Sequence, residues 1–154
     1  MNVKKEKYII IEIIPTTRSK YSGEIAQISA LKLDGLVLKD RFDYRLNEDK
    51  ILIPDILRIV SYDKEKFNYL DSTNELLTKF QLWSEDLPIL ILDNDYTNDY
   101  LSELKNKRIS ITDILKIDYS NDVIEKLIAL YKLEPSNYIV DLLYESILKS
   151  DLNS

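Results

Sequence analysis

The sequence predicts an α/β (α+β) fold, a mixed sheet in which three antiparallel N-terminal strands are followed by strands that alternate with helices. Three observations support this fold class. Apolar runs with strand spacing fill the first third of the chain, apolar residues at helical spacing fill most of the rest, and short aliphatic runs recur between the helical segments. The length of 154 residues suits one hydrophobic core, so we expect one domain over residues 1–154.

The first third predicts three strands in antiparallel succession, at residues 8–14, 24–33 and 36–44. Five isoleucines between Tyr8 and Pro15 indicate that the first strand is buried on both faces. The second run suits a strand with one buried face. Asp34-Gly35, a favoured two-residue hairpin turn, joins it to the third strand.

Beyond Pro54 the pattern becomes mainly helical. A short helix follows Pro54, and Asp63 is a candidate cap for another brief turn. A longer helix is expected to begin at Asp71 or Ser72, because both residue types cap helices and the apolar residues that follow keep helical spacing. The remaining elements are predicted as a strand at 89–92, a helix at 95–105, a strand at 108–111 and helices at 122–133 and 137–149.

Composition excludes several classes of function. The net charge of −6 argues against broad, sequence-blind binding of nucleic acid, which needs a basic surface. The chain has no cysteine and no histidine, so disulfides, zinc-thiolate sites, thiol nucleophiles and a histidine base are absent. No apolar run is long enough for a membrane span, and no cleavage site follows the first apolar run. We therefore expect a soluble, cytoplasmic chain that does not contact membranes.

Glu12 is the residue that most needs a functional explanation. It lies inside the isoleucine run, where an ionised carboxylate is costly unless it meets a cation, a metal or hydrogen-bond donors. Two interpretations remain open. Glu12 either binds a metal ion, or its carboxylate is held by Lys, Arg or Tyr donors.

Several motifs occur in a fixed order along the chain. Ile11-Glu12-Ile13-Ile14 is followed by Ile25-Ala26-Gln27-Ile28-Ser29-Ala30, by a hairpin, and by the block Leu-Asp-Asn-Asp-Tyr-Thr-Asn-Asp-Tyr-Leu at residues 92–101. From about Tyr8 to Leu148 this order resembles the DEDDh branch of the 3′–5′ exonucleases, the family of bacterial proofreading subunits. The family's motifs read Asp-x-Glu, Ile-x-x-Ile-(Gly/Ser)-Ala and His-Asn-x-x-Phe-Asp-x-x-Phe-Leu. The resemblance implies a ribonuclease H-like mixed sheet.

The resemblance also implies a site in which four acids hold two divalent cations, Mg or Mn, roughly 4 Å apart, and a histidine deprotonates the attacking water. Carried over by position, the acids become Glu12, Ile14, Thr97 and Asp141, and the histidine becomes Ser136. Only Glu12 and Asp141 keep a carboxylate. Ile14 cannot bind a metal, Thr97 is at best a weak neutral ligand, and Ser136 is no base at neutral pH.

Other residues and plainer roles compete with this assignment. Asp93, at the end of a predicted strand, is a further candidate ligand. Asp141 shares a helical stripe with Asn137 and Glu145, which suits surface exposure. Ser136 suits an N-terminal cap of the last helix.

The lost motif residues favour a catalytically degenerate 3′–5′ exonuclease-like domain, a pseudoenzyme without a metal cofactor that acts by binding a protein or a single-stranded nucleic acid. No catalytic residue is then assigned. The alternative is a weakly active 3′–5′ exonuclease on single-stranded DNA or RNA. In that alternative Mg or Mn is held by Glu12, Asp141 and Asp93.

Overall fold

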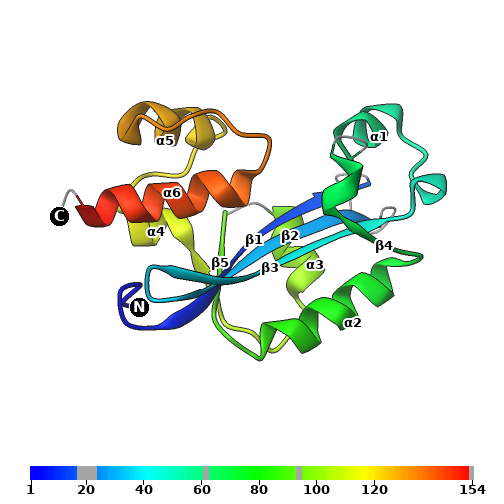
Figure 1. Cartoon of the computed structure of the whole chain (residues 1–154), viewed down its shortest axis with the longest axis horizontal. Coiled ribbons are helices and arrows are strands. Elements are labelled where there is room, and N and C mark those ends of the chain that lie inside the picture. The colour runs from blue at the N-terminus through cyan, green and yellow to red at the C-terminus, as the bar shows by residue number, and fades with distance from the viewer. Residues whose placement is uncertain (17–23, 61–62, 93–94, 153–154) are drawn as a thin grey trace.

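The computed structural model describes residues 1–16, 24–60, 63–92 and 95–152 (Figure 1). Its strands are β1 (Lys7–Pro15), β2 (Ile25–Asp34), β3 (Val37–Leu46), β4 (Asn68–Leu70), β5 (Ile89–Ile91) and β6 (Arg108–Ser110). Its helices are α1 (Pro54–Val60), α2 (Thr73–Ser84), α3 (Asp95–Leu101), α4 (Ile111–Leu115), α5 (Val123–Tyr131) and α6 (Ile139–Leu152), with 3-10 turns at Glu48–Lys50 and Lys64–Lys66. No helix among the described residues has the length and apolarity that crossing a bilayer requires.

The strands form one six-stranded mixed sheet in the order β4-β3-β2-β1-β5-β6. β1, β2 and β3 run antiparallel to one another, whereas β5 pairs parallel with β1 and β6 pairs parallel with β5. The predicted fold class is therefore confirmed, including the change from a meander to strands that alternate with helices.

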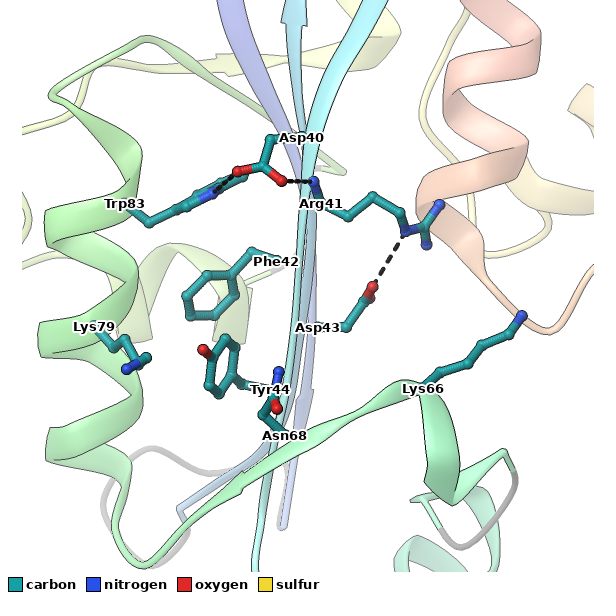
Figure 2. A pocket seen from close by; sticks show the side chains of 9 residues that line it. All are labelled: Asp40, Arg41, Phe42, Asp43, Tyr44, Lys66, Asn68, Lys79 and Trp83. Atoms are coloured by element: carbon teal, nitrogen blue, oxygen red, sulfur yellow. Dashed lines mark hydrogen bonds and ion pairs between the residues drawn. The ribbon is translucent and has the colours of Figure 1, made fainter.

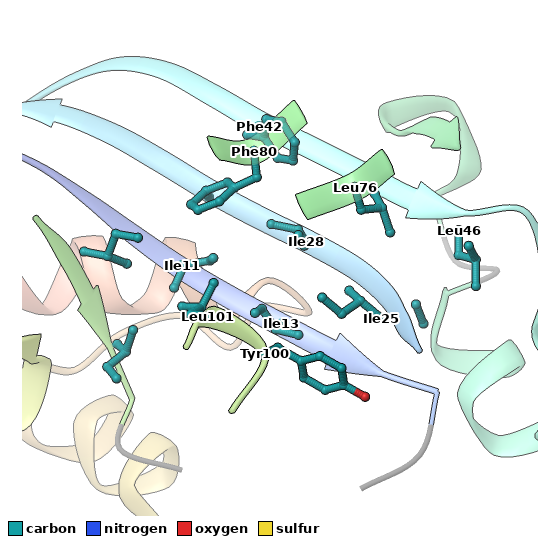
Figure 3. Packing of buried hydrophobic residues seen from close by; sticks show 14 of the residues in the cluster. Ile11, Ile13, Ile25, Ile28, Phe42, Leu46, Leu76, Phe80, Tyr100 and Leu101 are labelled. Atoms are coloured by element: carbon teal, nitrogen blue, oxygen red, sulfur yellow. The ribbon is translucent and has the colours of Figure 1, made fainter. Parts of the chain in front are cut away.

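Both faces of β1 are buried, as the isoleucine run predicts. Ile9, Ile11 and Ile13 pack in the cluster that α2 and α3 cover, which Figure 3 shows from close by. Tyr8 and Ile10 pack in the opposite cluster, which α4, α5 and α6 cover. Figure 1 shows α5 and α6 on one side of the sheet and α2 on the other. Glu12 continues the Tyr8–Ile10 alternation, so its side chain belongs to the α6 face.

Several element boundaries differ from the predicted ones. β4 and α4 were not predicted as elements, because runs of three and five residues are too short to display a period. α3 ends at Leu101 rather than residue 105. The last two helices cover residues 123–131 and 139–152 instead of 122–133 and 137–149.

α2 follows Ser72, whose Oγ accepts a hydrogen bond from the backbone N–H of Glu75, so Ser72 is the N-cap. Asp63 takes the N-cap position of the turn at Lys64–Lys66, but its side chain makes no capping bond.

The hairpin between β2 and β3 turns one residue later than expected. Asp34 pairs with Val37, so the two loop residues are Gly35 and Leu36 rather than Asp34 and Gly35. The pairing register of β2 and β3 also shifts between Lys32 and Leu33, just before the turn. Gly35 has a φ of 60°, and its N–H donates to the backbone oxygen of Glu6.

Gly35→Ala is expected to lower the free energy of unfolding by about 1–3 kcal/mol, because alanine is strained at positive φ. A Cβ atom there would also lie 2.6 Å from the backbone oxygen of Lys4. Urea denaturation measures the change. Val37→Ala, at a residue of the same hairpin that is 57% exposed, is the control and should change stability by about 0.5 kcal/mol. Equal effects of the two substitutions would refute the steric argument.

β3 has a long free edge. β2 pairs with one edge of β3, and β4 pairs with the other edge only at Tyr44–Leu46. Among the described residues, no strand therefore lies on that second edge from Val37 to Asp43. Within this edge the backbone N–H of Arg41 donates to Oδ1 of Asp40, 2.8 Å away. The side chain of Asp40 thus occupies a backbone donor of the open edge.

Candidate functional site

Glu12 lies beneath the start of α6. It stands opposite Ser29 of β2, which in turn stands opposite Asp43 of β3, so the three side chains share one face of the sheet. The backbone N–H of Ile139 donates to the Glu12 carboxyl group. Oε1 of Glu12 is buried and has no hydrogen-bond partner among the described residues. Burial, together with the negative charge of Asp141, raises the pKa of Glu12 to about 7, and the Ile139 bond opposes this rise only in part.

Asp141 of α6 is held by an arginine. Nη1 of Arg41 lies 2.8 Å from Oδ1 of Asp141, and Nε of Arg41 lies 3.1 Å from Oδ2 of Asp43. Burial lowers the pKa of Arg41, but the two carboxylates outweigh burial and raise it, so Arg41 is a permanent cation. Figure 2 shows the Arg41–Asp43 contact on the side of β3 that faces α6. Arg41 thus pairs with Asp141 and not with Glu12, and the donor that Glu12 receives is the backbone N–H of Ile139.

The other described positions that the resemblance assigns to the site hold neither a carboxylate nor an imidazole. Ile14 is half-buried hydrocarbon, and Thr97 is 3% exposed. Ser136 is exposed, and its Oγ accepts a hydrogen bond from the backbone N–H of Tyr138, a local structural role just before α6. Asp93 lies outside the described residues, so the structure does not test it as a ligand.

Sequence reasoning missed a buried polar row beside Glu12. Arg45 of β3 is 2% exposed and donates from Nε to Oε1 of Gln27, 2.7 Å away. Gln27 in turn donates to Oγ of Ser29 at 2.9 Å, and the Arg45 guanidinium lies 3.5 Å from the ring centroid of Phe67. The signal was present in the sequence, since Gln27 and Ser29 are the polar residues of the otherwise apolar stretch Ile25–Leu31.

A pocket of about 690 Å³ lies at the C-terminal end of β1, between α1 and the start of α6. Nine of its fourteen lining residues are aliphatic or proline, among them Ile14, Ile56 and Ile139. Glu12 and Thr97 also line it. Three of the five family positions therefore meet in one pocket, and no Lys or Arg is among its described lining residues.

A second cavity, of about 320 Å³, lies at the free edge of β3 (Figure 2). Its aromatic wall includes Phe42 and Trp83, and Nε1 of Trp83 donates to Oδ2 of Asp40 at 2.9 Å. Arg41 and Asp43, on the other side of the strand, bind each other. Because these polar groups bond to one another, the pocket at the end of β1 is the stronger candidate site.

A pair of divalent cations does not fit the donors at the β1 pocket. Hard cations need several oxygen ligands, most of them carboxylates. Within the described ranges no group of three or more His, Cys, Asp or Glu side chains is placed to hold a metal ion. Asp141 is already paired with Arg41, and Ile14 offers no oxygen ligand.

No protein-family model matches the chain, and no curated protein is similar enough in sequence to match. Solved structures do match in shape. A moderately thermophilic exonuclease I from Methylocaldum szegediense aligns with a TM-score of 0.65 at 12% identity, over 96% of this chain and 40% of its own. E. coli exonuclease I in complex with a dT13 oligonucleotide aligns with a TM-score of 0.58 at 13% identity, over 97% of this chain and 41% of its own.

The zinc-bound form of the E. coli exonuclease I–single-stranded DNA complex aligns with a TM-score of 0.56 at 14% identity, over 95% of this chain and 40% of its own. The chain thus spans about two fifths of the length of these neighbours. Such low identities establish a shared architecture and not a shared activity. The chain has the ribonuclease H-like fold of exonuclease I.

Proposed function

We propose that the chain is a catalytically degenerate exonuclease-like domain, comprising residues 1–154, that binds a ligand without cleaving nucleic acid. The ion pair between Arg41 and Asp141 is the observation that carries the proposal. In the family that the sequence resembles, metal ions neutralise the acids of the site. Here a guanidinium neutralises Asp141, and the hydrocarbon of Ile14 replaces a second acid.

The pocket favours an apolar ligand over a nucleic-acid strand. Binding of a single strand needs cations that follow the phosphates, usually with aromatic platforms for the bases. The described lining of the pocket has neither a Lys or Arg nor an aromatic residue, and the chain carries a net charge of −6. The negative net charge repels a phosphate backbone, and the described lining offers it no counter-charge, whereas the aliphatic walls suit hydrocarbon.

We expect no metal-dependent cleavage of 5′-labelled single-stranded DNA or RNA in Mg²⁺ or Mn²⁺. The assay is a time course on denaturing gels with Glu12→Ala and Asp141→Ala as matched controls, and all three proteins should leave the substrate intact. Turnover by the wild-type chain that both substitutions abolish would overturn the proposal.

A weakly active nuclease with one metal ion is the second candidate. Its support is that Asp141 lies close enough to Glu12 to raise the pKa of Glu12, so two family carboxylates remain neighbours. A thermal-shift titration with Mn²⁺ separates the two functions. The degenerate domain should show no stabilisation at millimolar Mn²⁺, whereas stabilisation that disappears in Glu12→Ala and Asp141→Ala would favour the nuclease.

A further inference from the structure

We propose that the pocket at the end of β1 binds a small aliphatic amine, with the alkyl body on the isoleucines and the ammonium group at the Glu12 carboxyl. The inference rests on the proposed function, because it assigns a ligand to a pocket that no longer cleaves nucleic acid. It follows from the size of the pocket, the nature of its walls, and the buried Oε1 of Glu12, which has no hydrogen-bond partner among the described residues.

Size and walls select a small apolar ligand. A volume of about 690 Å³ falls within the range of pockets that enclose small molecules, about 300–1,000 Å³. Ile14 approaches from β1, Ile56 and Ile59 from α1, and Ile139 from α6. An alkyl chain that enters between them removes apolar surface of both ligand and protein from water.

The charge of the pocket selects a cation. Glu12 and Asp55 are the described acids of the lining, and Asp55 is ion-paired with Arg58 on the same helix. Glu12 has only the backbone N–H of Ile139 as a donor, and its Oε1 is buried without a partner among the described residues. A carboxylate ligand would meet a like charge, and a hydrocarbon would leave Oε1 without a donor. An ammonium group supplies both a positive charge that neutralises the Glu12 carboxylate and an N–H that donates a hydrogen bond to Oε1.

The neighbouring acids are already ion-paired, so we assign the binding of the ammonium group to Glu12. On the α6 side Asp141 pairs with Arg41, which also holds Asp43 of β3. On the α1 side Asp55 pairs with Arg58. Glu12 is therefore the lining acid that an incoming cation can neutralise without breaking an existing ion pair. Because the pKa of Glu12 is about 7, its carboxylate forms between pH 6 and pH 8, whereas an alkylamine stays protonated throughout.

The test is an NMR titration of the full ¹⁵N-labelled chain with n-hexylamine, n-hexanol and hexanoate at pH 8. We expect hexylamine to bind with a Kd on the order of 1 mM, which suits seven non-hydrogen atoms, and to shift the amides of β1 and the start of α6. Hexanol should bind about tenfold more weakly, and hexanoate should not bind. Lowering the pH to 6 should weaken hexylamine about tenfold, because Glu12 then carries its proton.

Matched variants separate the contribution of the Glu12 charge to amine binding from that of the apolar walls. Glu12→Gln should weaken hexylamine about tenfold, remove the pH dependence, and leave hexanol unchanged. Ile56→Ala should weaken hexylamine and hexanol by equal factors. Glu125→Gln makes the same charge change at an exposed residue of α5 and should leave every affinity unchanged.

Three results would overturn the proposal: equal affinities for hexylamine and hexanol, unchanged hexylamine binding by Glu12→Gln, or tighter binding of N-acetyl-lysine amide than of hexylamine. The last would assign the pocket to a lysine of a partner protein. Failure of the proposed function is a separate outcome. It would appear as nuclease turnover, whereas failure of the amine assignment would appear in a chain that still does not cleave.

Discussion

Glu12→Gln should raise the melting temperature at pH 8 by about 5–10 °C, because the wild-type chain must hold a buried negative charge at that pH. The pKa of Glu12 moves from 4.5 to about 7 on folding. A difference of this size corresponds to a cost of about 3 kcal/mol once Glu12 is fully ionised. Glutamine keeps the shape of the side chain and an oxygen that accepts the Ile139 N–H.

The pH dependence has a definite sign. A carboxyl group whose pKa is higher in the folded chain binds more protons when folded, so its contribution to stability falls as pH rises from about 4.5 to about 7. Above pH 7 the cost is constant. The stability of Glu12→Gln relative to wild type should therefore grow by about 2–3 kcal/mol between pH 4.5 and pH 8.

Urea denaturation of both chains at half-unit pH intervals measures this difference. Glu125→Gln, at an exposed residue of α5, is the control and should run parallel to wild type across the whole range. If the Glu12→Gln curve also runs parallel to wild type, Glu12 is not buried as an unpaired acid, and the pocket lacks the polar group that an amine would bind.

Arg45→Ala is expected to lower the free energy of unfolding by about 3–5 kcal/mol. The Arg45 side chain is 2% exposed and its guanidinium packs on the ring of Phe67 at 3.5 Å. Truncation leaves a cavity beside Phe67 and Gln27. It also removes the donor of Oε1 of Gln27, which then lies buried without a partner.

Arg45→Met is the matched variant, because methionine refills most of the volume but donates no hydrogen bond. We expect it to cost about half as much as alanine. Urea denaturation at pH 7 measures both. A loss below about 1 kcal/mol for Arg45→Ala would mean that the polar row contributes little to the stability of the sheet.

The fold was predictable where local chemistry and tertiary packing agree. The isoleucine run of β1 is buried on both faces, as its unbroken β-branched pattern predicts, and Ser72 caps α2 as its residue type predicts. An element could not be predicted from the sequence where its existence depends on a neighbour that is distant along the chain. β4 has three residues and exists because Tyr44–Leu46 of β3 offer it a partner.

The candidate site was predictable in its position but not in its chemistry. The sequence directs attention to Glu12 and to losses at Ile14 and Thr97, and these three residues do line one pocket. The partner of Asp141 could not be predicted, because Arg41 lies 100 positions away and charged residues occur throughout the chain. Only the folded sheet brings β3 beneath α6 and decides which carboxylate receives the guanidinium.

The free edge of β3 has a consequence for how the molecule behaves at high concentration. An unpaired strand can template the addition of another chain, and continued addition leads to fibrils. Asp40 occupies the N–H of Arg41 with its own carboxylate, and the flanking side chains on this edge are charged. The strand of a second molecule must displace the Asp40 carboxylate before it can form a backbone hydrogen bond with the N–H of Arg41. We therefore expect Asp40 to oppose aggregation through this edge.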